Sequence, residues 1–187
     1  MAVWIGEGRT TRLARSTMEQ LATPVRAKKG VHGHLVIHSA PSALRTHIEW
    51  ALQHQLGASV EITWLPQPHS AGTFRTTISY KDLFGVASQL ASTLRGWHYI
   101  RFELTECDGT TGEMYRFTPE LGLHRATIDG SGSVLVEENK IIAALSSSFD
   151  EESLRECIEK ALGTAWDREL EIFRGVELQE IVRLRAI

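Results

Sequence analysis

The sequence predicts an α+β fold: a ferredoxin-like β-α-β-β-α-β core with an added β-hairpin and C-terminal helices. Two observations predict it. Short β-prone segments, most of them alternating apolar and polar residues, are interleaved with two segments whose apolar residues recur at helical spacing. The 187-residue chain is also 42% hydrophobic, enough to fill one core. We expect a flexible basic N-terminal arm at 1–30, the ferredoxin-like core at 31–108, and the hairpin and helical appendage packed on the core at 109–187.

The first strand and helix of the core are expected between residues 34 and 57. Residues 34–38 form a β-prone run, and Ser39 is expected to cap the helix that follows, with Pro41 in its first turn. Gly57 stands where a helix C-terminus is expected. The apolar stripe of this helix comprises Leu44, Ile48, Ala51, Leu52 and Leu56.

The second half of the core repeats these signals. Residues 60–64 and 74–80 alternate apolar and polar side chains, which predicts two half-buried strands joined by a loop. Asp82 is expected to cap a second helix, which runs to Gly96. A fourth strand is expected at 100–105.

The remaining residues predict the appendage. Residues 115–117, 123–128 and 134–136 are strand-like, and the last two are separated by a hairpin signal. Helices are expected at 139–145 and after Asp150, with a break at Gly163. The last seven residues, 181–187, are either a strand or an interaction tail.

The polar face of the predicted sheet holds the candidate binding residues. In a ferredoxin-like order the first strand is central, so its polar side places His34 and His38 in the middle of this face. Arg75 lies on one flank, and Arg101 and Glu103 lie on the other. Such a face can bind a polar ligand or a partner protein. A solvated face and a face covered by the appendage remain alternatives.

No catalytic motif is present, and the chain is expected not to be an enzyme. Ser39 lacks a surrounding G-x-S-x-G elbow, and no glycine-rich loop opens a helix. His32 and His34 form an H-x-H pair without a third ligand nearby, so no metal is expected. Cys107 and Cys157 give neither a disulfide framework nor a zinc spacing. We expect no cofactor, and the strands lack the pattern of RNA-recognition domains, so nucleic acid is not an expected partner.

The N-terminal arm is basic although the whole chain has a net charge of −3. Six basic residues against Glu7 and Glu19 give residues 1–30 a net charge of +4. The arm can steer toward an acidic partner, or it can be a solvated tail, and a transit peptide ranks below both. No apolar run approaches the roughly 20 residues of a membrane span, and no secretory signal is visible, so a cytoplasmic location is expected. The basic residues are Arg9, Arg12, Arg15, Arg26, Lys28 and Lys29.

Several short motifs together resemble an uncharacterised actinobacterial family known as a domain of unknown function. They include H-S-A-P at 38–41, H-I-E-W-A-L at 47–52, L-R-G-W at 94–97 and A-W-D at 165–167. The match runs from about Gly30 to Arg174 and leaves out the basic arm. The resemblance supplies no catalytic residues. It implies a context, because genes of this family are often found beside genes of fatty-acid synthesis, and such association is not a mechanism.

These observations give two functional expectations. The first is a non-catalytic binding or regulatory subunit that docks on an acyl-CoA carboxylase, a fatty-acid synthase component or acyl carrier protein, using the basic arm and the mixed sheet face. The alternative is a small-ligand sensor or an enzyme that uses His34, His38, Arg101 and Glu103, because a histidine beside a carboxylate can transfer a proton.

Overall fold

The protein is described by a computed structural model that covers residues 30–185. Of residues 176–185 it describes the backbone only, and the side chain of Leu83 is likewise outside the description. The six basic residues of the expected arm lie outside the described residues.

Seven strands form one sheet in the described part of the chain, in the order β2-β3-β1-β4-β5-β6-β7. All neighbouring strands are antiparallel, and β1 lies between β3 and β4. The expected α+β class is confirmed. The strands are β1 (Gly30–Pro41), β2 (Leu65–Pro66), β3 (Thr73–Leu83), β4 (Arg101–Cys107), β5 (Thr111–Thr118), β6 (Gly122–Asp129) and β7 (Val134–Leu135).

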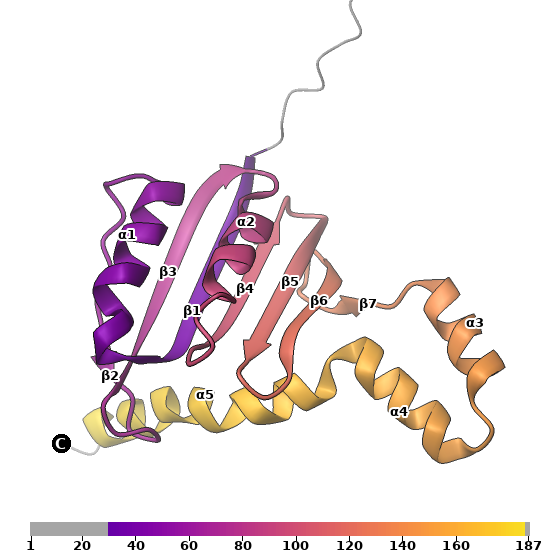
Figure 1. The fold of residues 1–187 in the computed structure, drawn as a ribbon. Coiled ribbons are helices and arrows are strands. Elements are labelled where there is room, and N and C mark those ends of the chain that lie inside the picture. The colour runs from indigo at the N-terminus through magenta and orange to yellow at the C-terminus, as the bar shows by residue number, and fades with distance from the viewer. Residues whose placement is uncertain (1–29, 186–187) are drawn as a thin grey trace, which may run out of the picture.

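The helices fall into two groups (Figure 1). Helices α1 and α2 lie against one face of the sheet, whereas α3 and α4 project beyond β7 and α5 runs back across the end of the sheet toward β2. A short 3-10 turn, Ser42–Leu44, precedes α1. The helices are α1 (Arg45–Leu56), α2 (Val86–Leu94), α3 (Glu138–Ser147), α4 (Glu151–Leu162) and α5 (Thr164–Arg185).

The main core lies between the sheet and α1 and α2. Strand β4 shows how the sequence builds it, because alternate residues Phe102, Leu104 and Glu106 are buried while the residues between them are half-buried. Phe102 stacks on Phe117 of β5 with ring centroids 5.4 Å apart. The large, fully buried aliphatic side chains of this core are Leu35, Ile37, Ile48, Leu52, Leu90, Leu94, Ile100 and Leu104.

Ser39 does not cap a helix, contrary to expectation. Strand β1 continues through Ser39 to Pro41, and its pairing register shifts just after Ile37 against both neighbouring strands. The bulge lets the chain bend within the sheet, so α1 begins only at Arg45 and without a side-chain cap. Ser39 itself is buried.

The strand expected at residues 60–64 is not a strand. Only Leu65–Pro66 pairs with β3. Val60, Ile62 and Trp64 are still half-buried against the core, and the indole Nε1 of Trp64 donates a hydrogen bond to Glu49 of α1 at 2.7 Å. The alternation of apolar and polar residues at 60–64 therefore reflects an extended segment that is buried on one side and does not pair with a strand of the sheet.

The cap of α2 is also different from the one expected. Asp82 lies inside β3, and α2 begins after Gly85, which has a φ of 105°. The carboxylate of Glu106, fully buried on β4, accepts hydrogen bonds from the backbone N–H groups of Gly85 at 2.7 Å and Ala87 at 3.2 Å. It meets the free N–H groups of the helix start, although it is distant in sequence.

The appendage follows the expected order of elements. Asp150 caps α4 by accepting a hydrogen bond from the backbone N–H of Ser153 at 2.8 Å. Gly163 separates α4 from α5 with a φ of 72°. Between residues 181 and 185 the backbone is helical, so the strand alternative for this segment is wrong.

Candidate functional site

Helix α5 packs on the polar face of the sheet, the side of β1, β3 and β4 that carries His34, Thr77 and Glu103. It crosses the strands at the end of the sheet where β2 lies (Figure 1). Leu170 of α5 is fully buried. The polar face is therefore neither fully solvated nor fully covered, and the edge of α5 creates a concave site.

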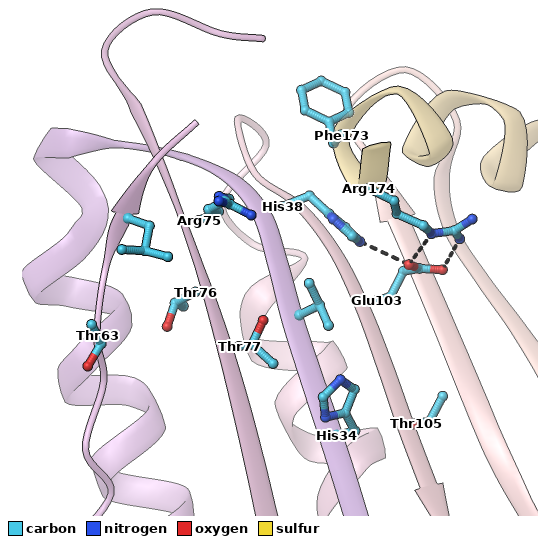
Figure 2. Close-up of a pocket in the computed structure, with 12 residues that line it drawn as sticks. His34, His38, Thr63, Arg75, Thr76, Thr77, Glu103, Thr105, Phe173 and Arg174 are labelled. Atoms are coloured by element: carbon cyan, nitrogen blue, oxygen red, sulfur yellow. Dashed lines mark hydrogen bonds and ion pairs between the residues drawn. The ribbon is translucent and has the colours of Figure 1, made fainter. Parts of the chain in front are cut away.

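A cavity of about 720 Å³, which we call the sheet cavity, lies on this face beside α5. Its volume is within the range of roughly 300–1000 Å³ found for small-molecule sites. Threonine and aliphatic side chains form much of its wall. The residues that carry its chemistry are His34, His38, Arg75 and Glu103 from the sheet and Phe173 and Arg174 from α5 (Figure 2).

Glu103 is the centre of the polar network in this site. Its carboxylate lies 2.9 Å from Nε2 of His38 and accepts two hydrogen bonds from Arg174, one of them at 2.8 Å (Figure 2). It also accepts a hydrogen bond from Nε of Arg116 at 3.1 Å. Burial by itself would raise the pKa of Glu103, but the hydrogen bonds and charges of His38 and Arg174 outweigh it. The pKa of this carboxyl therefore lies well below its ordinary range, and Glu103 is an anion in the folded protein.

His38 is held at two points. Its ring faces Glu103, and its backbone carbonyl accepts a hydrogen bond from the side-chain amide of Gln67 at 2.7 Å. The amide oxygen of Gln67 in turn accepts from the backbone N–H of His69 at 3.2 Å. With Nε2 directed at the carboxylate, Nδ1 is the ring nitrogen of His38 that is left for another partner. Such a ring is oriented for hydrogen bonding or proton transfer.

The cavity lining, as far as it is described, contains no hydroxyl–base or thiol–base arrangement built on serine or cysteine. Among the described residues its hydroxyl groups belong to threonines, and neither a serine nor a cysteine lines it. Two arginines and two histidines face one carboxylate. The arrangement therefore suits recognition of an anion better than acyl transfer.

The structure brings together four of the five predicted binding residues. His34 is exposed on the open side, with Nδ1 3.2 Å from the hydroxyl of Ser79. Arg75 is 7% exposed and lies in the wall. Arg101 does not line the cavity, because its guanidinium pairs with Glu169 of α5 at 3.1 Å and lies over the ring of Phe173, 5.1 Å from its centroid.

Arg174, Phe173 and Gln67 are functional candidates that sequence reasoning missed. Arg174 and Phe173 come from the appendage, where no local pattern connects them with the core strands. Gln67 lies between two prolines in a segment expected to be a loop, and its burial depends on contacts with β1.

Other features were searched for across the part of the chain that is described. Within residues 30–175, whose side chains are described, no group of three or more histidine, cysteine or acidic side chains could hold a metal ion. None of the described helices is long and apolar enough to cross a membrane.

Comparison with known proteins places the chain in one family. The family model described as "Protein of unknown function (DUF3145)" matches residues 34–184. No curated protein and no solved structure matches the chain.

Proposed function

The chain belongs to the DUF3145 family, for which no function is described. From its geometry we propose that it is a non-catalytic binding or regulatory protein that holds a small carboxylate or phosphate anion in the sheet cavity. The observation that carries this proposal is the composition of the wall. Among the described residues that line the cavity, one carries a carboxylate, Glu103. Four lining residues are basic or carry imidazole rings: His34, His38, Arg75 and Arg174.

Anion binding agrees with the state of Glu103. Glu103 is paired with His38, Arg116 and Arg174, so it repels a second anion less than a lone carboxylate would, although both arginines are shared with Asp167. His34 adds a ring that is bonded only to a neutral hydroxyl, that of Ser79. Cationic and neutral donors thus face the cavity from three sides, which suits a carboxylate or phosphate of small size.

A regulatory role is suggested by the fact that the walls of the sheet cavity come from two separate parts of the fold. The sheet supplies the floor, whereas Phe173 and Arg174 belong to α5, a helix that is held on the sheet by side-chain contacts such as the Arg174–Glu103 ion pair. A ligand that contacts both the sheet and α5 binds more tightly when α5 is docked on the sheet than when it is not. Binding therefore shifts the equilibrium toward the docked position, by an amount set by this difference in affinity. Helix α5 is therefore the element whose position reports occupancy.

The sheet and its two covering helices are, in our proposal, a ferredoxin-like unit extended by β5–β7. The strand order β2-β3-β1-β4 and the alternation of helices and strands along the chain support this interpretation.

The proposed partner is an enzyme of acyl-CoA carboxylation or fatty-acid synthesis, or acyl carrier protein, in the cytoplasm of an actinobacterium. This part of the proposal is supported by the gene context that the family resemblance implies, and by the basic arm, which suits an acidic partner. Native purification at low and at high salt tests it. If no enzyme of lipid synthesis copurifies under either condition, the proposed partner is wrong.

The ligand proposal is tested by isothermal titration calorimetry of the full chain with acetate, malonate and inorganic phosphate. At least one of these anions should bind, and His34→Ala and His38→Asn should weaken that binding about tenfold or more, as expected for loss of roughly 1.4 kcal/mol. His98→Ala is the matched control, because His98 is exposed and does not line the cavity. If none of the anions binds, or if the two cavity variants bind as the control does, the sheet cavity is not an anion site.

A further inference from the structure

A second cavity, of about 460 Å³, lies between the α3–α4 helical hairpin, strand β6 and the first turns of α5. We call it the hairpin cavity. It shares no lining residue with the sheet cavity. Its volume also falls in the range of small-molecule sites, roughly 300–1000 Å³.

The lining of this cavity separates into an apolar body and a cationic rim. Its neutral wall is formed by Leu123, Ala143, Ala144, Ala161 and Trp166, together with Ser147 and Cys157. The rim carries Arg125, Lys140 and Lys160, and no acidic side chain lines the cavity.

The absence of acidic side chains from the lining is not a consequence of the composition of the hairpin. Residues 137–162, which include both helices of the hairpin, carry seven acidic and three basic residues. Two of those three bases, Lys140 and Lys160, line the cavity, while all seven acids lie elsewhere on the hairpin. A random arrangement of these charges would place acids around the cavity as well, so the local potential is positive on an otherwise acidic element.

The two lysines are also without neutralising partners. No ion pair joins the ammonium group of Lys140 or Lys160 to a carboxylate within the described residues, whereas Arg125 is paired with Glu113. Their charges are therefore available to a ligand. A single surface lysine would carry no such implication, but here two flank one apolar hollow.

The floor of the cavity contains a buried polar group. His124 of β6 is 8% exposed, lies against Trp166 with ring centroids 4.9 Å apart, and has a buried Nδ1 without a hydrogen-bond partner. Burial lowers the pKa of His124, so the ring is neutral at pH 7 and does not repel the rim cations. The floor is thus aromatic and uncharged, and the positive charge is confined to the mouth.

We propose that the hairpin cavity binds an amphipathic carboxylate, with its hydrocarbon body on the wall formed by Leu123, Ala144 and Trp166 and its carboxylate between Lys140 and Lys160. Each half of the lining selects one half of such a molecule. The apolar wall gains from burying hydrocarbon, and the two ammonium groups bind the anionic head.

The hairpin is anchored lightly enough to admit a ligand. Ala144 is the only buried side chain of α3, and α4 has none. Ile142, Leu145 and Phe149 are exposed. Few buried contacts oppose a small displacement of α3 and α4 from β6, so the cavity can adjust to a hydrocarbon body.

The proposal is tested with octanoate as the probe and the full chain as the protein, by isothermal titration calorimetry at constant ionic strength. Octanoate should bind at least tenfold more tightly than octanol, which lacks the charge, and more tightly than acetate, which lacks the hydrocarbon body. The double variant Lys140→Gln/Lys160→Gln should weaken octanoate binding about tenfold or more. Lys81→Gln, which lies on β3 and outside this cavity, should leave it unchanged.

A second variant tests the hydrocarbon half. Ala143 is exposed yet lines the cavity, so Ala143→Phe fills the hollow without replacing a core residue. It should abolish octanoate binding while circular dichroism shows an unchanged fold, and His38→Asn in the sheet cavity should have no effect. Equal binding of octanol and octanoate, or octanoate binding that survives both the lysine and the Ala143→Phe changes, would overturn the proposal.

Discussion

Replacement of Glu103 by glutamine is the most informative single change, because this carboxylate joins α5 to the sheet. Its side chain is 17% exposed and accepts hydrogen bonds from His38, Arg116 and Arg174. Removing one partner of a largely buried ion pair costs about 3–5 kcal/mol when the other charge is left alone. Asp167 still pairs with both arginines, which reduces the loss. We therefore expect Glu103→Gln to lower the free energy of unfolding by about 3 kcal/mol.

The effect should depend on pH with a definite sign. The pKa of Glu103 is lower in the folded state than in the unfolded chain, where a glutamate titrates near about 4.3. The stability contributed by Glu103 is therefore fully present above the unfolded pKa and is lost as the pH falls through the depressed folded pKa. The difference between the wild type and Glu103→Gln should shrink as the pH falls from about 4 to 2.

Urea unfolding followed by circular dichroism at pH 7, 5 and 3 measures this difference. Hydrogen exchange of the α5 amides adds the local readout, since α5 should exchange faster in the variant than the core strands do. Glu120→Gln is the matched control, because Glu120 pairs with Arg101 but its side chain is 60% exposed, and it should cost about 0.5 kcal/mol or less. If Glu103→Gln costs no more than this control, or if its cost is larger at pH 3 than at pH 5, the assignment of Glu103 as the anchor of α5 is refuted.

Three further changes test other contacts of the fold. Gly163→Ala should destabilise the protein by about 2 kcal/mol, because Gly163 has a φ of 72° and a Cβ there would lie 2.5 Å from the ring of His124. An unchanged melting temperature would contradict this. Glu106→Gln should lower the free energy of unfolding by about 2 kcal/mol and speed hydrogen exchange in the first turn of α2. The reason is that the buried carboxylate accepts hydrogen bonds from two backbone N–H groups, which a side-chain amide cannot both satisfy. Exchange protection equal to that of the wild type would argue against this cap. Trp166→Phe should cost about 1 kcal/mol in urea unfolding, because it removes the 2.9 Å hydrogen bond to the carbonyl of Gly122, and a cost near zero would show that this bond adds nothing to the docking of α5.

Much of the candidate site was visible in the sequence, but its environment was not. Strand alternation correctly placed His34, His38, Arg75 and Glu103 on one face, because side chains of a strand point to opposite sides with a period of two. The same alternation misled at residues 60–64, where one side of an extended segment is buried without pairing in the sheet. The start of a helix after Asp150 was predicted correctly, and its cap partner is only three residues away, whereas the cap expected from Asp82 was wrong, because the cap of α2 comes from β4.

The sequence by itself determined the local elements and the side of the sheet on which each side chain lies, because both follow from the periods of the helix and the strand. Only the tertiary structure decided what covers the polar face. Arg174 and Glu103 are separated by 71 residues, and their ion pair turns an open sheet face into a walled cavity. No local pattern encodes such a contact, since it depends on how the hairpin of α3 and α4 directs α5 back across the strands.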